Sequence, residues 1–150
     1  MNIRRARAAD AETLTQIAVA AKRQWQYPES WILAWLDVLT ITPEYIAEHP
    51  TYLAEVENDI AGFHAVQIDG DKAVLDHLWV RPAFMRQGIG GALFRHAEGV
   101  ARAARATRLR ITSDPHAAPF YSHMGATQHG QKPAPMDGVI RFLALFEKAL

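Results

Sequence analysis

The sequence contains no cysteine, which excludes disulfide bonds and zinc sites built on thiolates. No apolar run approaches the roughly 18 residues that a membrane-spanning helix needs, and no secretory leader is expected before the first helix. The seven histidines show no H-x-x-x-H spacing and no supporting acidic cluster, so we expect no metal site. The 150 residues are 49% hydrophobic, which suits one cytoplasmic domain over residues 1–150 with a substantial core.

The net charge of zero conceals an uneven distribution. Residues 24–80 contain ten acidic residues and one basic residue, whereas residues 81–110 contain seven arginines and one acidic residue. This asymmetry is consistent with an anionic ligand beside the basic part and a cationic substrate beside the acidic part, and equally with two solvated faces. The arginines have no interleaved aromatic residues and the whole chain is not basic, so nucleic acid is not an expected partner.

Hydrophobic periodicity and turn residues predict an α+β fold with the order β-α-α-β-β-β-α-β-α-β. The antiparallel meander of its first half leads into a central strand, loop and helix. The expected strands are a short one near Ile3, three in the meander at 51–57, 60–68 and 72–80, and two more at 107–112 and 139–146. The expected helices begin at Asp10, Ser30, Pro43, the Gly-rich stretch and Asp114, and residues 128–138 are expected to form a loop.

The centre of this pattern is residues 74–93, which read as a buried strand, a turn at Pro82, a Gly-rich loop and the start of a helix. A Gly-rich turn that opens a helix presents free backbone N–H groups at the positive end of the helix dipole. Such a loop binds phosphate, although it can also be a simple turn. The dinucleotide pattern G-x-G-x-x-G fails because its third glycine would be Leu93, and no Gly-Lys-Ser/Thr of a P-loop follows.

This stretch resembles the acyl-CoA signature of the GNAT N-acetyltransferases, in which a strand ending in Val-x-Pro is followed by Arg/Gln-x-x-Gly-x-Gly/Ala. Val80-Arg81-Pro82 and residues 86–93 fit that pattern, and Met85 departs from it where Arg or Gln is usual. The resemblance spans nearly the whole chain and implies the GNAT fold, with acetyl-CoA as co-substrate. It implies cofactor contacts at Leu78, Trp79, Val80, Arg86, Gln87, Gly88, Ile89, Gly90 and Gly91.

A second stretch, Asp114 to Ala126, resembles the family segment Asn-x-x-Ala-x-x-Phe-Tyr-x-x-x-Gly-Phe. The resemblance implies that this helix contacts the pantetheine arm and that Tyr121 protonates the departing thiolate. The alternative role for Tyr121 is packing. Asp114 replaces the usual Asn, and we expect it to contact the cofactor and to cap the helix.

Acyl transfer by direct attack in a ternary complex fits the residues present, because the chain has no cysteine and no G-x-S-x-G elbow. A backbone N–H near Leu78 to Val80 would polarise the thioester, as the resemblance implies. Asp76 is the first candidate for the general base, since period-two alternation places it on the strand face of Leu78 and Val80, among apolar neighbours. His64, His77 and water remain alternatives.

The resemblance implies an N-acetyltransferase acting on a primary amine of a small molecule or a peptide, with homodimer formation also consistent with it. Two alternatives stay open, a non-catalytic acyl-CoA-binding module and a regulator that binds ATP or NAD through the same loop. The acceptor, the length of the acyl group and the oligomeric state do not follow from the sequence. We expect the segment from Trp25 to Pro50 to determine the acceptor.

Overall fold

A mixed sheet of seven strands is the scaffold of the computed structural model, which describes all of residues 1–150. Its order is β1-β2-β3-β4-β5-β7-β6, and only β4 and β5 pair in parallel. This mixed sheet with flanking helices confirms the predicted α+β class. The strands are β1 Asn2–Arg5, β2 Thr51–Val56, β3 Asp59–Asp69, β4 Lys72–Val80, β5 Arg108–Ser113, β6 Thr127–Pro133 and β7 Phe142–Ala149.

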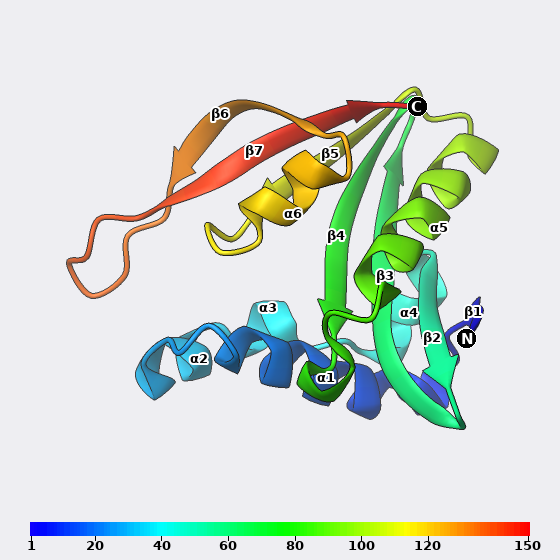
Figure 1. The fold of residues 1–150 in the computed structure, drawn as a ribbon, viewed down its shortest axis with the longest axis horizontal. Coiled ribbons are helices and arrows are strands. Elements are labelled where there is room, and N and C mark those ends of the chain that lie inside the picture. The colour runs from blue at the N-terminus through cyan, green and yellow to red at the C-terminus, as the bar shows by residue number, and fades with distance from the viewer.

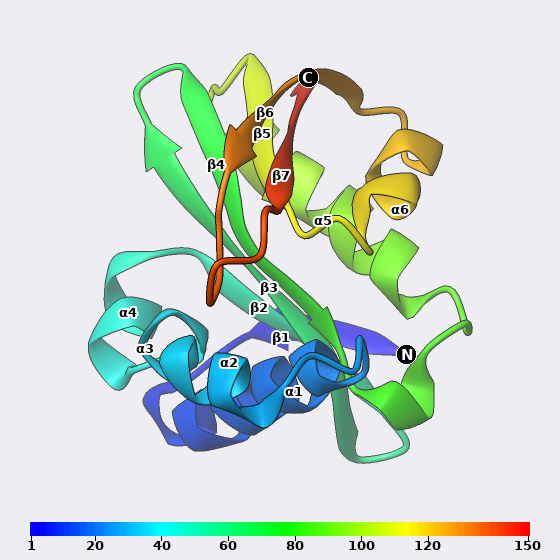
Figure 2. The same ribbon diagram turned by 90° about the vertical axis from the view of Figure 1, so that its left-hand side faces the viewer.

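Helices cover both faces of the sheet (Figures 1 and 2). On one face, α1 packs Leu14 and Ile17 against Phe63 of β3. On the other face, α5 and α6 pack against the sheet through Phe94 and Tyr121. The helices are α1 Ala11–Arg23, α2 Glu29–Ala34, α3 Leu36–Leu39, α4 Pro43–Glu48, α5 Ile89–Ala103 and α6 Ala118–His123, with short 3₁₀ helices η1 Ala8–Asp10 and η2 Pro82–Phe84.

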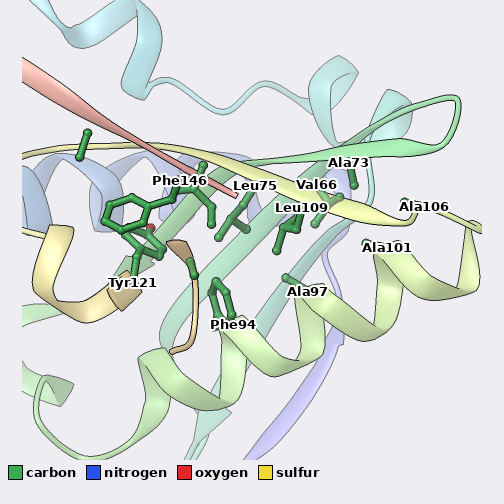
Figure 3. Close-up of a cluster of buried hydrophobic side chains, with 13 residues drawn as sticks. Val66, Ala73, Leu75, Phe94, Ala97, Ala101, Ala106, Leu109, Tyr121 and Phe146 are labelled. Carbon is green, nitrogen blue, oxygen red and sulfur yellow. The ribbon is translucent and has the colours of Figure 1, made fainter. Parts of the chain in front are cut away.

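The larger core lies between the sheet, α5 and α6 (Figure 3). Helix α5 contributes Phe94, Ala97 and Ala101, which recur at helical spacing and are all fully buried. They meet Leu109 of β5 and Phe146 of β7. Full burial of a Phe or Leu side chain stabilises the fold by roughly 1.5–3 kcal/mol. This packing fixes the position of α5, and with it the loop at its beginning.

The two parallel strands in the middle of the sheet separate soon after they meet. Strands β4 and β5 pair only at their beginnings, from Lys72↔Arg108 to Val74↔Arg110. Beyond these residues the strands diverge, and Figure 2 shows the gap between them. The edge of β4 that faces β5 therefore has unpaired backbone groups over its second half. Backbone groups without a strand partner are available to a ligand.

The meander of β2, β3 and β4 agrees with the sequence prediction, and β4 covers the predicted residues 72–80. Its two turns use left-handed backbone, with φ of 51° at Glu57, 68° at Asn58 and 61° at Gly70. Asparagine and glycine adopt this conformation more readily than other residues. The turn residues therefore explain why the sequence placed both hairpins correctly.

The C-terminal part differs from the prediction. Residues 127–133 form the edge strand β6 where a loop was expected, and the final strand is Phe142–Ala149 rather than 139–146. Strand β6 is mostly exposed, so it has no apolar face for sequence patterns to detect. It is held instead by its pairing with β7, and Pro133 is tolerated because it ends an edge strand.

Two predicted helix starts also differ. Asp10 does not cap α1 with its side chain, because its backbone is already helical as the last residue of η1. Its carboxylate accepts hydrogen bonds from the Arg7 N–H at 2.8 Å and from Arg4 at 3.0 Å instead. Helix α2 begins at Glu29, directly after Pro28, so Ser30 lies inside it and caps nothing. The predicted start at Pro43 is correct, because Thr42 Oγ1 accepts the N–H of Tyr45 at 3.0 Å.

Candidate active site

The Gly-rich loop connects β4 to α5 and is held by one buried side chain. Ile89 is 4% exposed and packs beside Leu93 in the core. Arg86 and Gly88 have left-handed backbone, with φ of 62° and 82°. Gly88 adopts this conformation without a steric penalty, because it has no Cβ. The Gln87 side chain turns back and donates to the Ala83 carbonyl at 3.4 Å.

Free N–H groups gather at the start of α5. Ile89, Gly90 and Gly91 are its first residues, so no carbonyl lies one turn earlier to accept their N–H groups. The N–H of Ala92 is the first to bond within the helix, at 3.1 Å from the Gly88 carbonyl. With the helix dipole, these groups form a site for an anion. The adjoining cavity of about 350 Å³ is lined by Val80, Phe84, Met85, Arg86, Gly88, Gly90, Gly91 and Phe120.

An apolar cleft continues from this anion site. It has a volume of about 210 Å³ and shares Val80, Gly90 and Phe120 with the first cavity. A Cβ on Gly90 would lie 3.4 Å from the Phe120 ring, an ordinary van der Waals contact, so the glycine lines the cleft beside this ring. The lining suits an extended, mostly uncharged chain. It consists of Trp25, Leu78, Val80, Gly90, His116, Ala117, Phe120 and Tyr121.

A narrow passage of about 80 Å³ follows, in the gap between β4 and β5. It shares Leu78 and Tyr121 with the cleft and adds Asp76 and Trp79, so the structure brings these four predicted residues together. The passage is the point at which the cofactor-side residues and the candidate base meet. Its lining is Trp25, Leu75, Asp76, Leu78, Trp79, Thr112, Ser113, Asp114, Ala117 and Tyr121.

Tyr121 lies on α6 at the junction of the cleft and the passage. Its ring is 8% exposed and packs against Phe94, Phe120 and Phe146, with ring centroids 5.1–6.0 Å apart. Burial is the only cause that shifts its pKa, and it raises that pKa well above the usual value. The hydroxyl therefore stays protonated near neutral pH.

A β-bulge lies at Asp76 and reorients it. Ala65 of β3 pairs with His77 and Val66 pairs with Leu75, which leaves Asp76 without a partner. A bulge interrupts the alternation of side chains along a strand. Asp76 and His77 consequently turn toward the same side of the sheet, with 3.6 Å between Asp76 Oδ2 and His77 Nε2.

The prediction that Asp76 shares a face with Leu78 and Val80 is therefore wrong. Those two residues face α5, whereas Asp76 faces α4 and accepts hydrogen bonds from the Tyr45 hydroxyl and from Gln67 Nε2. Its surroundings are polar rather than apolar, and its side chain is 34% exposed. The displaced carboxylate nevertheless lines both the narrow passage and the larger cavity beyond it.

His77 is a less suitable base than its sequence position suggested. The Trp79 indole N–H, which can only donate, is 3.0 Å from His77 Nδ1, so Nδ1 is the acceptor. In the neutral ring the proton then resides on Nε2 and faces the Asp76 carboxylate. Burial lowers the pKa of His77 and Asp76 partly opposes this shift. No lone pair of the neutral ring remains free for a substrate.

His64 lies outside all of the cavities that converge on Asp76. It is fully buried between β3 and α5, where its Nε2 is 2.9 Å from His96 Nδ1 and its ring stacks on Tyr52. Burial, assisted by His96, lowers the pKa of His64 to about 3. The structure thus gives His64 no access to a substrate, and its role as a base is not supported.

A cavity of about 500 Å³ opens on the far side of the passage. Asp76 and Trp79 line both, so the two spaces adjoin at these residues. The segment expected to select the acceptor supplies much of the wall, from Trp35 to Tyr45. The rest comes from α1, from β4, from the loop between β6 and β7 and from the start of β7. The complete lining is Lys22, Trp35, Asp37, Val38, Leu39, Thr40, Tyr45, Asp76, His77, Trp79, Ala134, Arg141 and Leu143.

Asp114 differs from its predicted role as a helix cap, because α6 begins only at Ala118. One carboxylate oxygen accepts the His116 N–H at 2.9 Å within a turn. The other accepts Lys22 Nζ at 2.7 Å and the Tyr27 hydroxyl at 2.8 Å. These bonds lower the pKa of Asp114 against the opposing effect of burial. Asp114 still lines the passage, but its partner Lys22 lines the cavity beyond it.

Sequence reasoning missed Lys22, Tyr27, Tyr45 and Arg141. Each stands alone in a segment without a motif, and Arg141 lies in what was assigned to a strand. Tyr27 and Tyr45 fall within the segment from Trp25 to Pro50 that is expected to determine the acceptor, whereas Lys22 and Arg141 lie outside it and carry no sequence signal. The fold brings them together because the loop before β7 approaches α1 and α2 (Figure 2), where Trp31 Nε1 donates to Asp137 at 2.6 Å.

Comparison with known families identifies one match. Residues 12–126 match the acetyltransferase (GNAT) family, which covers the Gly-rich loop, the passage and Tyr121. No curated protein sequence matches the chain significantly. No helix has the length and apolarity needed to cross a membrane, and no three metal-ligating side chains cluster in a way that could hold a metal ion.

Solved structures share the fold at low sequence identity. A GCN5-related N-acetyltransferase from Rhodopseudomonas palustris superposes with a TM-score of 0.82 and 22% identity, over 99% of this chain and 95% of that one. The PaiA N-acetyltransferase from Thermoplasma acidophilum, solved in complex with coenzyme A, has a TM-score of 0.75 and 21% identity over 99% and 98%. The ribosomal-protein-S18-alanine N-acetyltransferase from Escherichia coli has a TM-score of 0.75 and 18% identity over 99% and 92%.

Proposed function

The chain belongs to the acetyltransferase (GNAT) family, and on that premise we propose that it transfers the acetyl group of acetyl-CoA to a primary amine. The observation that carries the proposal is that Asp76 and Trp79 line both the cofactor-side passage and the large cavity. Two reactants held on either side of this point would meet without a covalent enzyme intermediate.

The cofactor side fits acetyl-CoA in three parts. The free N–H groups of Ile89, Gly90 and Gly91, with Arg86, would hold the pyrophosphate. The apolar cleft past Phe120 would hold the pantetheine arm, and the unpaired edge of β4 would bond its amides. Coenzyme A and acetyl-CoA occupy structural neighbours of this chain, including the Thermoplasma acidophilum and Salmonella typhimurium proteins.

The reaction requires one bond to form and one to break. The amine nitrogen attacks the thioester carbon, and a backbone N–H of β4 near Leu78 to Val80 stabilises the charge that develops on the oxygen. The amine proton passes to Asp76, directly or through water. As the carbon–sulfur bond breaks, the Tyr121 hydroxyl donates its proton to the sulfur and recovers one from solvent.

The narrow passage also bears on the acyl group. A volume of about 80 Å³ is only a few times the roughly 30 Å³ that one water occupies in the liquid. We therefore expect acetyl-CoA to be used in preference to butyryl-CoA, because a longer chain would meet Tyr121 and Trp79.

An amine panel tests the proposal. Acetyl-CoA and each amine are mixed with the protein, and release of free thiol is followed together with the acetylated product. Amine-dependent release supports an enzyme. Tight binding of acetyl-CoA with no amine-dependent product across the panel would favour the non-catalytic acyl-CoA-binding module.

Calorimetry with acetyl-CoA, ATP and NAD tests the nucleotide-binding alternative. We expect heat only with acetyl-CoA. Binding of ATP or NAD without binding of acetyl-CoA would contradict the proposal and favour a nucleotide-dependent regulator.

A further inference from the structure

Two buried cations line one end of the large cavity. Lys22 of α1 and Arg141, which precedes β7, have side chains that are 12% and 11% exposed. Both approach the same carboxylate oxygen of Asp114, with Lys22 Nζ at 2.7 Å and an Arg141 nitrogen at 3.7 Å. The family motifs explain Asp114 and Tyr121 but do not account for either cation.

One carboxylate does not neutralise this pair. Besides Asp76, the acid that lines this cavity is Asp37, which is exposed and forms no ion pair. Asp137, in the loop before β7, accepts the indole N–H of Trp31. One positive charge therefore remains unmatched in a largely buried setting. Burying an uncompensated charge is costly, and an anion bound beside it would offset that cost.

Aromatic rings hold both cations in place. Lys22 Nζ lies 4.3 Å from the centroid of the Trp35 ring, and the Arg141 guanidinium carbon lies 5.1 Å from the same centroid. Both also lie over the Tyr27 ring, at 5.1 Å and 5.5 Å. Such cation–π contacts stabilise the charged side chains and restrict their motion. The positive end of the cavity is consequently preorganised.

Donors at this end remain available. Of the three N–H groups of Lys22, one is used by Asp114. Arg141 donates to the Ala134 carbonyl and to the Tyr27 hydroxyl, both at 3.3 Å, which leaves further N–H groups of its five without a partner. A carboxylate is the anion that matches the planar donor arrangement of a guanidinium.

The other end of the same cavity is negative. Asp76, held by Tyr45 and Gln67, lies beside the passage in which the acyl group is expected. No hydrogen bond or ion pair connects Asp76, Tyr45 or Gln67 to Lys22 or Arg141. Much of the remaining wall is apolar and aromatic, with Leu39, Trp79 and Leu143 among its residues.

We propose that the acceptor is a small amino carboxylate, such as a free α-amino acid, whose ammonium group binds near Asp76 and whose carboxylate binds to Lys22 and Arg141. This inference rests on the proposed function and specifies its substrate class. A peptide N-terminus would place a neutral amide where a charge is needed, and a polyamine would bring further positive charge to Lys22 and Arg141. The cavity of about 500 Å³ lies in the usual range for small-molecule sites.

Matched acceptor pairs test this class directly. Phenylalanine is compared with phenethylamine and with phenylalanine amide, and leucine with isoamylamine and with leucine amide, all with acetyl-CoA. We expect the free amino acids to have a kcat/KM about ten- to a hundredfold higher, the size expected for charge-assisted hydrogen bonds. Equal or better use of the amines or amides would overturn the inference while leaving amine acetylation intact.

An Arg141→Gln variant sharpens the test. We expect it to lose most of the preference for the free amino acid over phenethylamine, mainly through a higher KM for the amino acid. Arg141→Lys, which keeps the charge, should restore part of the preference. Arg105→Gln, at an exposed arginine after α5, is the matched control. A preference that persists in folded Arg141→Gln contradicts the assignment.

Binding of products provides a readout that does not depend on turnover. The melting temperature is measured with coenzyme A and either N-acetylphenylalanine or N-acetylphenethylamine. We expect stabilisation mainly by the acid in the parent protein and little difference in Arg141→Gln. Absence of any preference for the acid would overturn the inference. Lack of turnover with every amine, combined with a preference for the acid in this assay, would instead contradict only the proposed catalysis.

Discussion

Two sides of the site meet at β4 and are built in different ways: the cavities proposed for the cofactor, and the large cavity proposed for the acceptor. The proposed cofactor side uses backbone N–H groups and mainly apolar side chains, most of them from one continuous stretch, 78–91, with Trp25 and residues at and just before α6. The acceptor side uses charged and aromatic side chains from positions as distant as Lys22, Tyr45 and Arg141. Backbone recognition tolerates most side-chain changes outside the glycines, whereas a side-chain network depends on each member. We therefore expect substitutions on the two sides to separate cofactor affinity from acceptor use.

The largest effect should come from Gly90→Asp. A carboxylate at the start of α5 would face the pyrophosphate, and like charges placed together cost several kcal/mol, which is a loss of affinity of about a hundredfold or more. Calorimetry with acetyl-CoA measures it, and circular dichroism checks that the variant is folded.

Two variants control for this substitution. Gly90→Ala should bind nearly normally, because its Cβ would lie 3.4 Å from the Phe120 ring. Gly99→Asp adds the same charge on the same helix at a position with no atom within 4 Å of the added Cβ. Native affinity in a folded Gly90→Asp variant would show that the loop is not the phosphate site.

The Tyr121→Phe substitution should affect chemistry on the cofactor side without affecting binding. The ring is kept, so we expect acetyl-CoA affinity to change little and kcat to fall on the order of 10²-fold, within the range of general acid catalysis. A thioester whose thiol has a lower pKa should partly rescue the variant, because that thiol leaves without a proton. Turnover within about twofold of the parent would show that Tyr121 only packs against its neighbours. The control variant is Tyr52→Phe, because Tyr52 lines none of the cavities.

The Asp76→Asn substitution should affect the acceptor side alone. We expect kcat/KM for the amine to fall by about ten- to a hundredfold, at or below the lower limit of the general-base range, since water can also accept the proton. Acetyl-CoA affinity should be unchanged. The loss should shrink as pH rises, because more of the amine is then neutral, and a loss that is independent of pH would contradict the role of a base. Asp71→Asn, in the turn before β4, is the control.

The smallest effect concerns His64, which belongs to neither cavity. Its folded pKa of about 3 lies below the value near 6.5 expected when unfolded. The unfolded chain therefore binds the proton first, so this contribution to stability is complete above pH 6.5 and is lost as pH falls toward 3. Below pH 6.5, His64→Gln should reduce the slope of unfolding free energy against pH by at most about 1.4 kcal/mol per unit.

Urea unfolding between pH 7.5 and 4 measures that slope, with the exposed His129→Gln as control. Turnover of His64→Gln should match the parent under conditions where both are folded. A large loss of turnover with unchanged stability would return His64 to the list of candidate bases.

The sequence by itself predicted the Gly-rich loop that we propose for the cofactor, because the structure there is local. Backbone conformation at Gly88 and free N–H groups at the start of α5 follow from neighbouring residues, so the loop from Arg86 to Gly91 could be recognised before folding. The fold class followed for the same reason, from periodicity and from turn residues such as Asn58 and Gly70.

Only the tertiary structure decided the acceptor side. The bulge that turns Asp76 toward Tyr45 depends on the register between β3 and β4, which alternation along one strand does not encode. Strand β6 depends on its partner β7 and has no apolar face of its own. The positive end of the cavity exists because Lys22 and Arg141, separated by most of the chain, converge on one carboxylate. Ion pairs of this kind depend on distances between side chains in the folded protein, and a sequence pattern does not contain those distances.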